Sequence, residues 1–354
     1  MSRKNYFYGE QKRKCYFEGW YFKHENGSQT ICFIPSFHID QRGQRSAMLQ
    51  VIANDHVWKI HYAPEQFYAA KGRLYCRIGR NVFSENGISI DIRTRELKMK
   101  GNLAYGKFAE LQWDIMGPFR RMPFLQCRHE IISMRHRVAG TLKLNREKIH
   151  FGKGSGYIEK DRGTSFPDRY VWTQCSRGAG GRLNLMAAAA TIPVGPFSFE
   201  GTIAEIWYGR RKYRLATYCG ARVKESTEKR MVIEQKNIKF EAQLQEKNPQ
   251  KLLAPQSGAM GRNIYEHAAC TVRYRLFENG EVIFNEICTP AGFEADIRGQ
   301  KRGEDPIQKT DHKDTERRLK RWKNRFRKLW SITQKKERRF HRRISSICCG
   351  RSRR

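Results

Sequence analysis

Three Asn-Gly pairs constrain the fold of this chain more than any other local feature. Each belongs to a Glu-Asn-Gly triplet, at residues 25–27, 85–87 and 278–280, between apolar or alternating runs. Asn-Gly accepts the positive φ angles of a tight hairpin, so each triplet predicts a turn between antiparallel strands. Residues 87–92 and 271–277 alternate with the two-residue period of a half-buried strand. Because helix-period segments are few and short here, the sequence predicts an all-β fold of barrels or sandwiches.

The chain divides into three predicted parts. At 354 residues it is long enough for two separate hydrophobic cores. Strand patterning breaks around residues 137–140, and the composition shifts after Gly299. We therefore expect a first β-barrel domain at 1–139, a second at 140–298 and a basic, partly helical tail at 299–354.

Positive charge is concentrated in the tail. The net charge is +34, and residues 301–354 carry 21 Lys and Arg against 6 Asp and Glu, a net of +15, which leaves +19 on the first 300 residues. Aromatic and apolar residues at helical spacing within 316–347 predict a basic amphipathic helix that binds an anionic membrane surface. The alternative is a solvated, partly disordered tail. No nucleic-acid-binding motif accompanies the charge, so nucleic acid is not the expected partner.

Targeting, cysteine and metal signals are weak. The sequence has neither a run of eighteen apolar residues nor a secretory signal at its start. We therefore predict a cytoplasmic protein that can associate with membranes. The ten cysteines form no Cys-x-x-Cys pair and are expected to be reduced. His129, His136 and His150 lack ligand spacing, so no metal is expected.

Two segments carry carboxyl groups that could take part in acid–base chemistry. Glu159 and Asp161 are two apart in a glycine- and aromatic-flanked stretch, so in a strand both carboxylates share one face. That face meets either an aromatic interior, as in a proton-transfer site, or water. Glu18 lies in the aromatic stretch 16–23. For Glu18 alone, a paired glutamate in a barrel core is the simpler interpretation.

Together these segments resemble the tocopherol cyclase-like family. The resemblance rests on motifs that occur in order: Phe17-Glu18-Gly19-Trp20-Tyr21-Phe22, Met116-Gly117-Pro118-Phe119, Cys127-Arg128-His129, Gly156-Tyr157-Ile158-Glu159-Lys160-Asp161, Ser165-Phe166-Pro167, Trp172-x-Gln174-Cys175, Ala216-Thr217-Tyr218, Leu253-Ala254-Pro255 and Ala291-Gly292-Phe293-Glu294. The family implies two consecutive lipocalin-like antiparallel β-barrels, distantly similar to carotenoid hydratases. It also implies acid-catalysed closure of a prenylated benzoquinol to a chromanol, without a cofactor.

The resemblance implies roles for individual residues. Glu159 would donate a proton to the alkene, Asp161 would be its partner, and Glu18 or His129 would be the base. Burial and a second carboxylate both raise the pKa of a carboxyl group, and aromatic faces stabilise a carbocation. The residues expected to bind a hydrophobic prenylated or lipid-like substrate are Trp20, Tyr21, Tyr157, Arg162, Phe166, Tyr170, Trp172, Gln174 and Tyr218.

The chain departs from the family pattern at two positions. Arg162 stands where tryptophan is usual, and Ser176 where asparagine is usual. A guanidinium beside Glu159 and Asp161 would lower their pKa values, which is the wrong direction for a general acid. A double barrel that binds lipid or isoprenoid without catalysis is therefore the alternative prediction.

Overall fold

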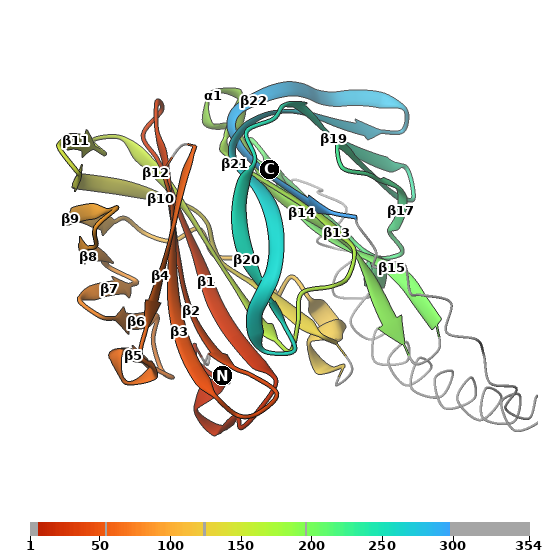
Figure 1. The fold of residues 1–354 in the computed structure, drawn as a ribbon. Helices are drawn as coiled ribbons and strands as arrows, with labels where there is room; N and C mark the ends of the chain where they lie inside the picture. The colour runs from red at the N-terminus through yellow and green to blue at the C-terminus, as the bar shows by residue number, and fades with distance from the viewer. Residues whose placement is uncertain (1–5, 54, 123–124, 195–196, 298–354) are drawn as a thin grey trace, which may run out of the picture. The chain divides into compact units, whose positions relative to one another are not determined.

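The structure is a computed structural model that describes residues 6–53, 55–122, 125–194 and 197–297. The first 298 residues form one compact unit, which consists of two antiparallel sheets (Figure 1). The predicted basic helix at 316–347 lies outside the described residues.

The first sheet contains twelve strands in the order β4-β3-β2-β1-β12-β10-β9-β8-β7-β6-β5, with β11 paired to β10. Their bounds are β1 Tyr16–Glu25, β2 Thr30–Ile39, β3 Arg45–Ala53, β4 His56–Tyr62, β5 Phe67–Ala69, β6 Tyr75–Ile78, β7 Asn81–Ser84, β8 Gly87–Arg93, β9 Lys98–Tyr105, β10 Cys127–Leu144, β11 Glu147–His150 and β12 Gly154–Gly163. Strands β1, β12 and β10 are neighbours at the centre of this sheet.

The second sheet contains ten strands in the order β16-β15-β14-β13-β22-β21-β19-β18-β17, with β20 paired to β21. Their bounds are β13 Tyr170–Arg177, β14 Leu183–Val194, β15 Phe197–Tyr208, β16 Arg211–Ala216, β17 Arg222–Ser226, β18 Arg230–Gln235, β19 Ile238–Glu246, β20 Gln250–Gln256, β21 Ala259–Glu278 and β22 Glu281–Asp296. The short helices are η1 Gly9–Gln11, η2 Pro64–Gln66, η3 Gly117–Arg121, α1 Gly178–Gly181 and η4 Thr217–Cys219. Among the described residues, no helix is long and apolar enough to cross a membrane.

Both sheets curl toward closure in the same way. In each sheet the two edge strands are consecutive in the chain and are joined by one 3₁₀ turn, η2 or η4. In the second sheet, Gln235 of β18 joins that strand to β16, the edge strand at the other end of the sheet. Its Oε1 accepts a hydrogen bond from the Ala216 amide (3.1 Å), and its Nε2 donates to the Arg214 carbonyl (3.0 Å). The prediction of an all-β fold with two consecutive antiparallel barrels is confirmed.

The change from one sheet to the other falls later than the predicted boundary between residues 139 and 140. Strand β10 runs through that position without a break, because Val138–Leu144 continue its pairing with β9. The first sheet ends at Gly163 and the second begins at Tyr170. The break in strand patterning around residues 137–140 therefore lies inside one long strand.

The three Glu-Asn-Gly triplets all lie in turns between consecutive paired strands, as predicted: β1–β2, β7–β8 and β21–β22. In the third turn, Asn279 has φ 55° and Gly280 has φ 83°, both in the left-handed region. Asparagine and glycine are the residues that adopt this conformation at least cost, which explains the strength of the signal.

Alternate side chains of the central strands pack into two different interiors: the core of the first sheet and a cluster between the two sheets. Trp20 and Phe22 on β1 pack into the core of the first sheet, whereas Tyr21 packs into a cluster shared by the two sheets. A separate core fills the second sheet. Because successive side chains of a strand point to opposite faces, a strand between two cores is apolar almost throughout. This explains the aromatic stretch at 16–23.

One buried ion pair lies inside the first sheet. The Lys160 Nζ is 2.9 Å from Glu18 Oε1, and the Tyr16 hydroxyl donates to Glu18 Oε2 (2.7 Å). Both charged side chains are almost fully buried. The Lys160 Nζ also donates to the Tyr6 carbonyl (3.0 Å). Glu18 is thus a paired glutamate in a barrel core.

We predict that Lys160→Met lowers the free energy of unfolding by about 3–5 kcal/mol, because it leaves the Glu18 carboxylate buried without its partner. The double variant with Glu18→Gln should recover part of the loss, since no charge then remains unpaired. Chemical denaturation measures both effects, with Lys148→Met on exposed β11 as the control. A Lys160→Met protein as stable as wild type would contradict the prediction.

Candidate active site

A cavity of about 200 Å³ lies between the two sheets. One wall comes from β1, β2, β3, β10 and β12 of the first sheet, and the other from β13, β14, β15, β20, β21 and β22 of the second. Most of the lining is apolar, and its aromatic members are Phe17, Trp20, Tyr21, Phe119, Phe166, Tyr170, Trp172 and Phe199. The carboxyl groups on the lining are those of Glu159, Asp161, Glu266 and Glu294. An apolar cavity with a few convergent polar groups is the usual form of a small-molecule site.

One oxygen of Glu159 has two hydrogen-bond donors and a nearby imidazole. Its Oε2 accepts from the Tyr157 hydroxyl (2.5 Å) and from the Trp172 indole (3.2 Å), and it lies 3.4 Å from His129 Nε2. Burial raises the pKa of Glu159, and although His129 opposes this, the value reaches about 7. Glu159 therefore keeps its proton to a higher pH than an exposed glutamate does.

His129 and Asp161 are a cross-strand pair beside Glu159. They are register partners on β10 and β12, and His129 Nδ1 lies 3.0 Å from Asp161 Oδ1. Burial lowers the pKa of His129, but the negative charges of Asp161 and Glu159 more than offset this and raise it to about 9. The imidazole therefore carries its proton at neutral pH and acts as a cation between two carboxyl groups.

Arg162 does not join this cluster, in contrast to the sequence prediction. Glu159 and Asp161 share the face of β12 that meets the cavity, and Arg162, one residue on, points to the opposite face. Its guanidinium lies over the Tyr8 ring, 3.8 Å from the ring centroid. The expected lowering of the Glu159 pKa by Arg162 is wrong, because the strand itself separates the two side chains.

Three other predicted residues also lie apart from the carboxyl cluster. Glu18 faces the interior of the first sheet with Lys160. Gln174 accepts a hydrogen bond from Lys23 (3.1 Å), and Tyr218 donates to the Ile115 carbonyl (2.8 Å) behind Phe119. The predicted residues that border the cavity are Glu159, Asp161, His129, Trp20, Tyr21, Phe166, Tyr170 and Trp172, while Tyr157 touches Glu159 from behind.

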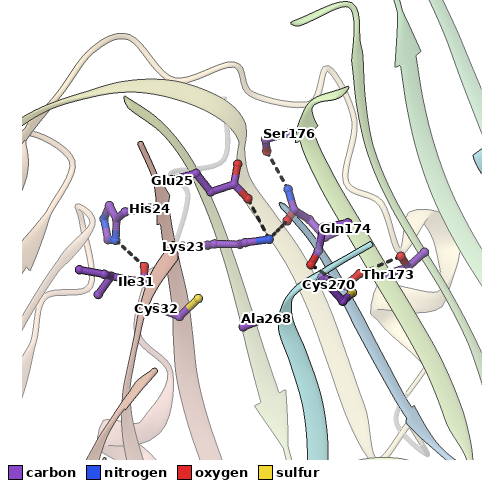
Figure 2. Close-up of polar contacts among 12 residues, drawn as sticks. Lys23, His24, Glu25, Ile31, Cys32, Thr173, Gln174, Ser176, Ala268 and Cys270 are labelled. Atoms are coloured by element: carbon purple, nitrogen blue, oxygen red, sulfur yellow. Dashed lines mark hydrogen bonds and ion pairs between the residues drawn. The ribbon is translucent and has the colours of Figure 1, made fainter. Parts of the chain in front are cut away.

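A buried lysine links the two sheets near the cavity. Figure 2 shows Lys23 between Glu25 (2.9 Å) on its own strand and Gln174 of the second sheet, whose amide donates to Ser176 (2.7 Å). Burial disfavours the charged ammonium, but Glu25 more than compensates and raises the pKa of Lys23 above its ordinary value. Ser176, one of the departures from the family pattern, thus orients the amide that receives Lys23.

Two carboxyl groups on the opposite wall were not predicted as site residues. Glu266 on β21 accepts a hydrogen bond from the Tyr21 hydroxyl (2.5 Å), and Glu294 on β22 accepts one from Tyr170. They are register partners in adjacent strands. Burial raises the pKa of Glu266 to about 7, and burial together with the charge of Glu266 raises that of Glu294 well above its ordinary value. Glu294 ends a quoted motif, but no local sequence signal marks Glu266.

Trp172 connects the two walls. Its indole nitrogen bonds to Glu159 on one wall, and its register partner on the other is Glu294. A Cβ at Gly292 would lie 2.8 Å from the Trp172 ring. Any larger residue at position 292 would therefore push the ring out of its position. The aromatic face and the acid are therefore fixed relative to each other.

His129, Glu159 and Asp161 have donor atoms within 4.8 Å of one another, which is close enough to surround a metal ion. The three side chains also contact one another directly: His129 Nδ1 lies 3.0 Å from Asp161 Oδ1, and His129 Nε2 lies 3.4 Å from Glu159 Oε2. They form an ion-pair cluster. Linear spacing could not have predicted it, because its members come from two paired strands.

Comparisons with known proteins agree with this fold. The family model described as tocopherol cyclase-like matches residues 86–294, more than half of the chain, which confirms the resemblance seen in the motifs. A crystal structure of CghA with Sch210972 has a TM-score of 0.52 at 9% identity and covers 80% of this chain and 88% of its own. At that identity the likeness shows the fold alone.

Two further structures are similar at lower scores. A putative AttH from Nitrosomonas europaea has a TM-score of 0.49 at 11% identity, with 79% of this chain and 92% of its own covered. Kievitone hydratase from Nectria haematococca has a TM-score of 0.49 at 9% identity, with 84% and 94% covered. A search of curated proteins gave no match.

We predict that Glu159 makes the stability of the fold depend on pH. Its pKa is higher in the folded chain (about 7) than its ordinary value of 4.5, so its proton stabilises the fold below pH 4.5, and this contribution is lost as pH rises through about 7. Between these limits the unfolding free energy of wild type should fall by about 3 kcal/mol relative to Glu159→Gln. Denaturation across this pH range measures it. Equal pH dependence in both proteins would contradict it, and exposed Glu228→Gln is the control.

Proposed function

Because this chain belongs to the tocopherol cyclase-like family, we propose that it catalyses acid-promoted addition of a hydroxyl group to the alkene of a prenylated benzoquinol or related isoprenoid. The observation that carries the proposal is Glu159, a buried carboxyl with a pKa of about 7 on the wall of an apolar, aromatic cavity. A general acid works best when its pKa lies near the working pH.

The geometry supports a specific division of roles. Glu159 would transfer its proton to the alkene, and the His129–Asp161 pair would stabilise the carboxylate left behind. The faces of Trp172 and Tyr170 would stabilise the tertiary cation by cation–π attraction. A substrate phenol would close a ring onto this cation, whereas water would give a tertiary alcohol. No cofactor is needed for either addition.

Cavity size bears on how the substrate would bind. The volume of about 200 Å³ is smaller than the roughly 300–1,000 Å³ of sites that enclose a drug-sized ligand. We therefore propose that the cavity receives the quinol ring and the reacting prenyl unit, and that a longer isoprenoid chain extends beyond it.

Purified protein incubated with a prenylated benzoquinol in D₂O should form a chromanol or tertiary alcohol that carries deuterium at the protonated carbon. Glu159→Gln should slow this at least about 100-fold, because the amide cannot donate the proton, while substrate affinity stays within a few-fold. Liquid chromatography with mass spectrometry measures both, with exposed Glu228→Gln as the control.

The outcomes separate catalysis from passive binding. Substrate binding by wild type without any product would favour the non-catalytic isoprenoid carrier, for which the apolar lining is the supporting observation. A Glu159→Gln protein with the wild-type rate would remove Glu159 from the mechanism.

We also propose that residues 316–347 bind an anionic membrane surface, where an isoprenoid substrate dissolves. Basic side chains contribute about 1 kcal/mol each near such a surface, and salt screens them. The full chain should float with vesicles that contain phosphatidylserine, and less so at high salt, whereas a chain that ends at Arg298 should not. Equal flotation of both forms would contradict this role of the tail. Neutral vesicles are the control.

A further inference from the structure

Addition of an O–H group across an alkene requires two proton transfers. One proton goes to carbon, and one leaves the attacking oxygen. Neither base suggested by the sequence fits the second transfer. Glu18 faces the first-sheet interior, where Lys160 pairs with it, and His129 holds its own proton at neutral pH. The carboxyl groups on the cavity lining are the remaining candidates for the acceptor of the hydroxyl proton.

Glu266 lies in the required place. Its carboxyl lines the same cavity as Glu159 but belongs to β21 of the other sheet. Only 2% of the residue is exposed, and the Tyr21 hydroxyl holds Oε1 in one orientation (2.5 Å). A substrate between the walls would therefore have a carboxyl group on each side.

We propose that Glu266 is the proton acceptor for the substrate hydroxyl, opposite the donor Glu159. This rests on the function proposed above and assigns the second half of that reaction. Glu294, bonded to Tyr170 and paired in register with Glu266, is the neighbouring carboxyl that completes this wall.

The electrostatics around Glu266 agree with this role. Glu266 and several titratable groups around it affect one another's pKa values. These groups are Tyr21 and Lys23 on β1, Cys32 on β2, Glu159 on β12, Cys270 on β21 and Glu294 on β22. Burial raises the pKa of Glu266, while the Tyr21 hydrogen bond and the Lys23 charge lower it, which leaves it at about 7. Ionised Glu266 in turn raises the pKa of Glu159. Ionisation of both carboxyl groups at once is therefore disfavoured, so a proton on Glu159 favours an ionised Glu266.

The step balances without a further reactant. The alkene electron pair takes the Glu159 proton to form a C–H bond. An oxygen lone pair forms the C–O bond to the resulting cation, and the hydroxyl proton passes to Glu266, whose carboxylate supplies the electron pair. Glu159 ends ionised and Glu266 protonated. Proton exchange with solvent restores both groups.

A quinol whose side-chain double bond is saturated tests this without turnover. Its hydroxyl should donate to ionised Glu266, so wild-type affinity should fall about fivefold to tenfold as pH drops below about 7. Glu266→Gln should bind about tenfold more weakly above pH 7 and lose this pH dependence. Isothermal titration calorimetry measures both.

Tyr21→Phe provides a second test that keeps the carboxyl. Loss of the Tyr21 hydrogen bond should move the midpoint of the affinity change to higher pH, since that bond lowers the Glu266 pKa. Exposed Glu228→Gln should bind as wild type does. Wild-type affinity and pH dependence in Glu266→Gln, or an unmoved midpoint in Tyr21→Phe, would overturn the proposal.

Turnover of the prenylated quinol separates this inference from the proposed function. If wild type binds the saturated quinol with the expected pH dependence yet forms no product, the proposed function fails and Glu266 stands as the hydroxyl acceptor of a binding site. If wild type forms product and Glu266→Gln forms it at the same rate, the function stands and the acceptor role fails. A wild type that does not bind the saturated quinol would overturn both.

Discussion

Burial of both faces of β1 and β12 is the constraint on which the rest of the structure depends. Each strand separates the interior of the first sheet from the space between the sheets. Because side chains alternate, one strand supplies polar groups to two chemically different places. On β12, Lys160 pairs with Glu18 in the barrel while Glu159 meets the cavity. Strand β12 thus carries a structural ion pair on one face and the Glu159 carboxyl group on the other, and the backbone of the sheet separates them.

This alternation explains which predictions succeeded. The two-residue spacing correctly placed Glu159 and Asp161 on one face, and the Asn-Gly turns correctly located three hairpins. The same period assigns Arg162 to the opposite face, so its nearness to Glu159 in the sequence does not bring the two side chains together. In a strand, adjacent residues are separated by the sheet, whereas residues two apart are neighbours. At residue 162, the alternation of side chains therefore predicts the position of the arginine better than its departure from the family motif does.

Other parts of the site could not be read from the sequence, because they depend on pairings between distant strands. His129 reaches Asp161 only through the register of β10 with β12, and Tyr21 reaches Glu266 across 245 residues. The register of a long bulged strand such as β10 follows from packing over its whole length. The sequence did not reveal the change from one sheet to the other for a related reason: the break in strand patterning around residues 137–140 lies within the continuous strand β10.

Charge balance gives the physical origin of the acid. Glu159, Glu266 and Glu294 are buried around one apolar cavity, where an ionised carboxylate without a partner is costly. The cations that lower their pKa values, His129 and Lys23, are already paired with Asp161 and Glu25. The remaining negative charge is most cheaply removed by protonation, so these carboxyls keep protons at a pH where exposed ones have lost them. Burial is thus the largest cause of the raised pKa of Glu159 and of Glu266, and the aromatic rings of Tyr170 and Trp172 line the same cavity.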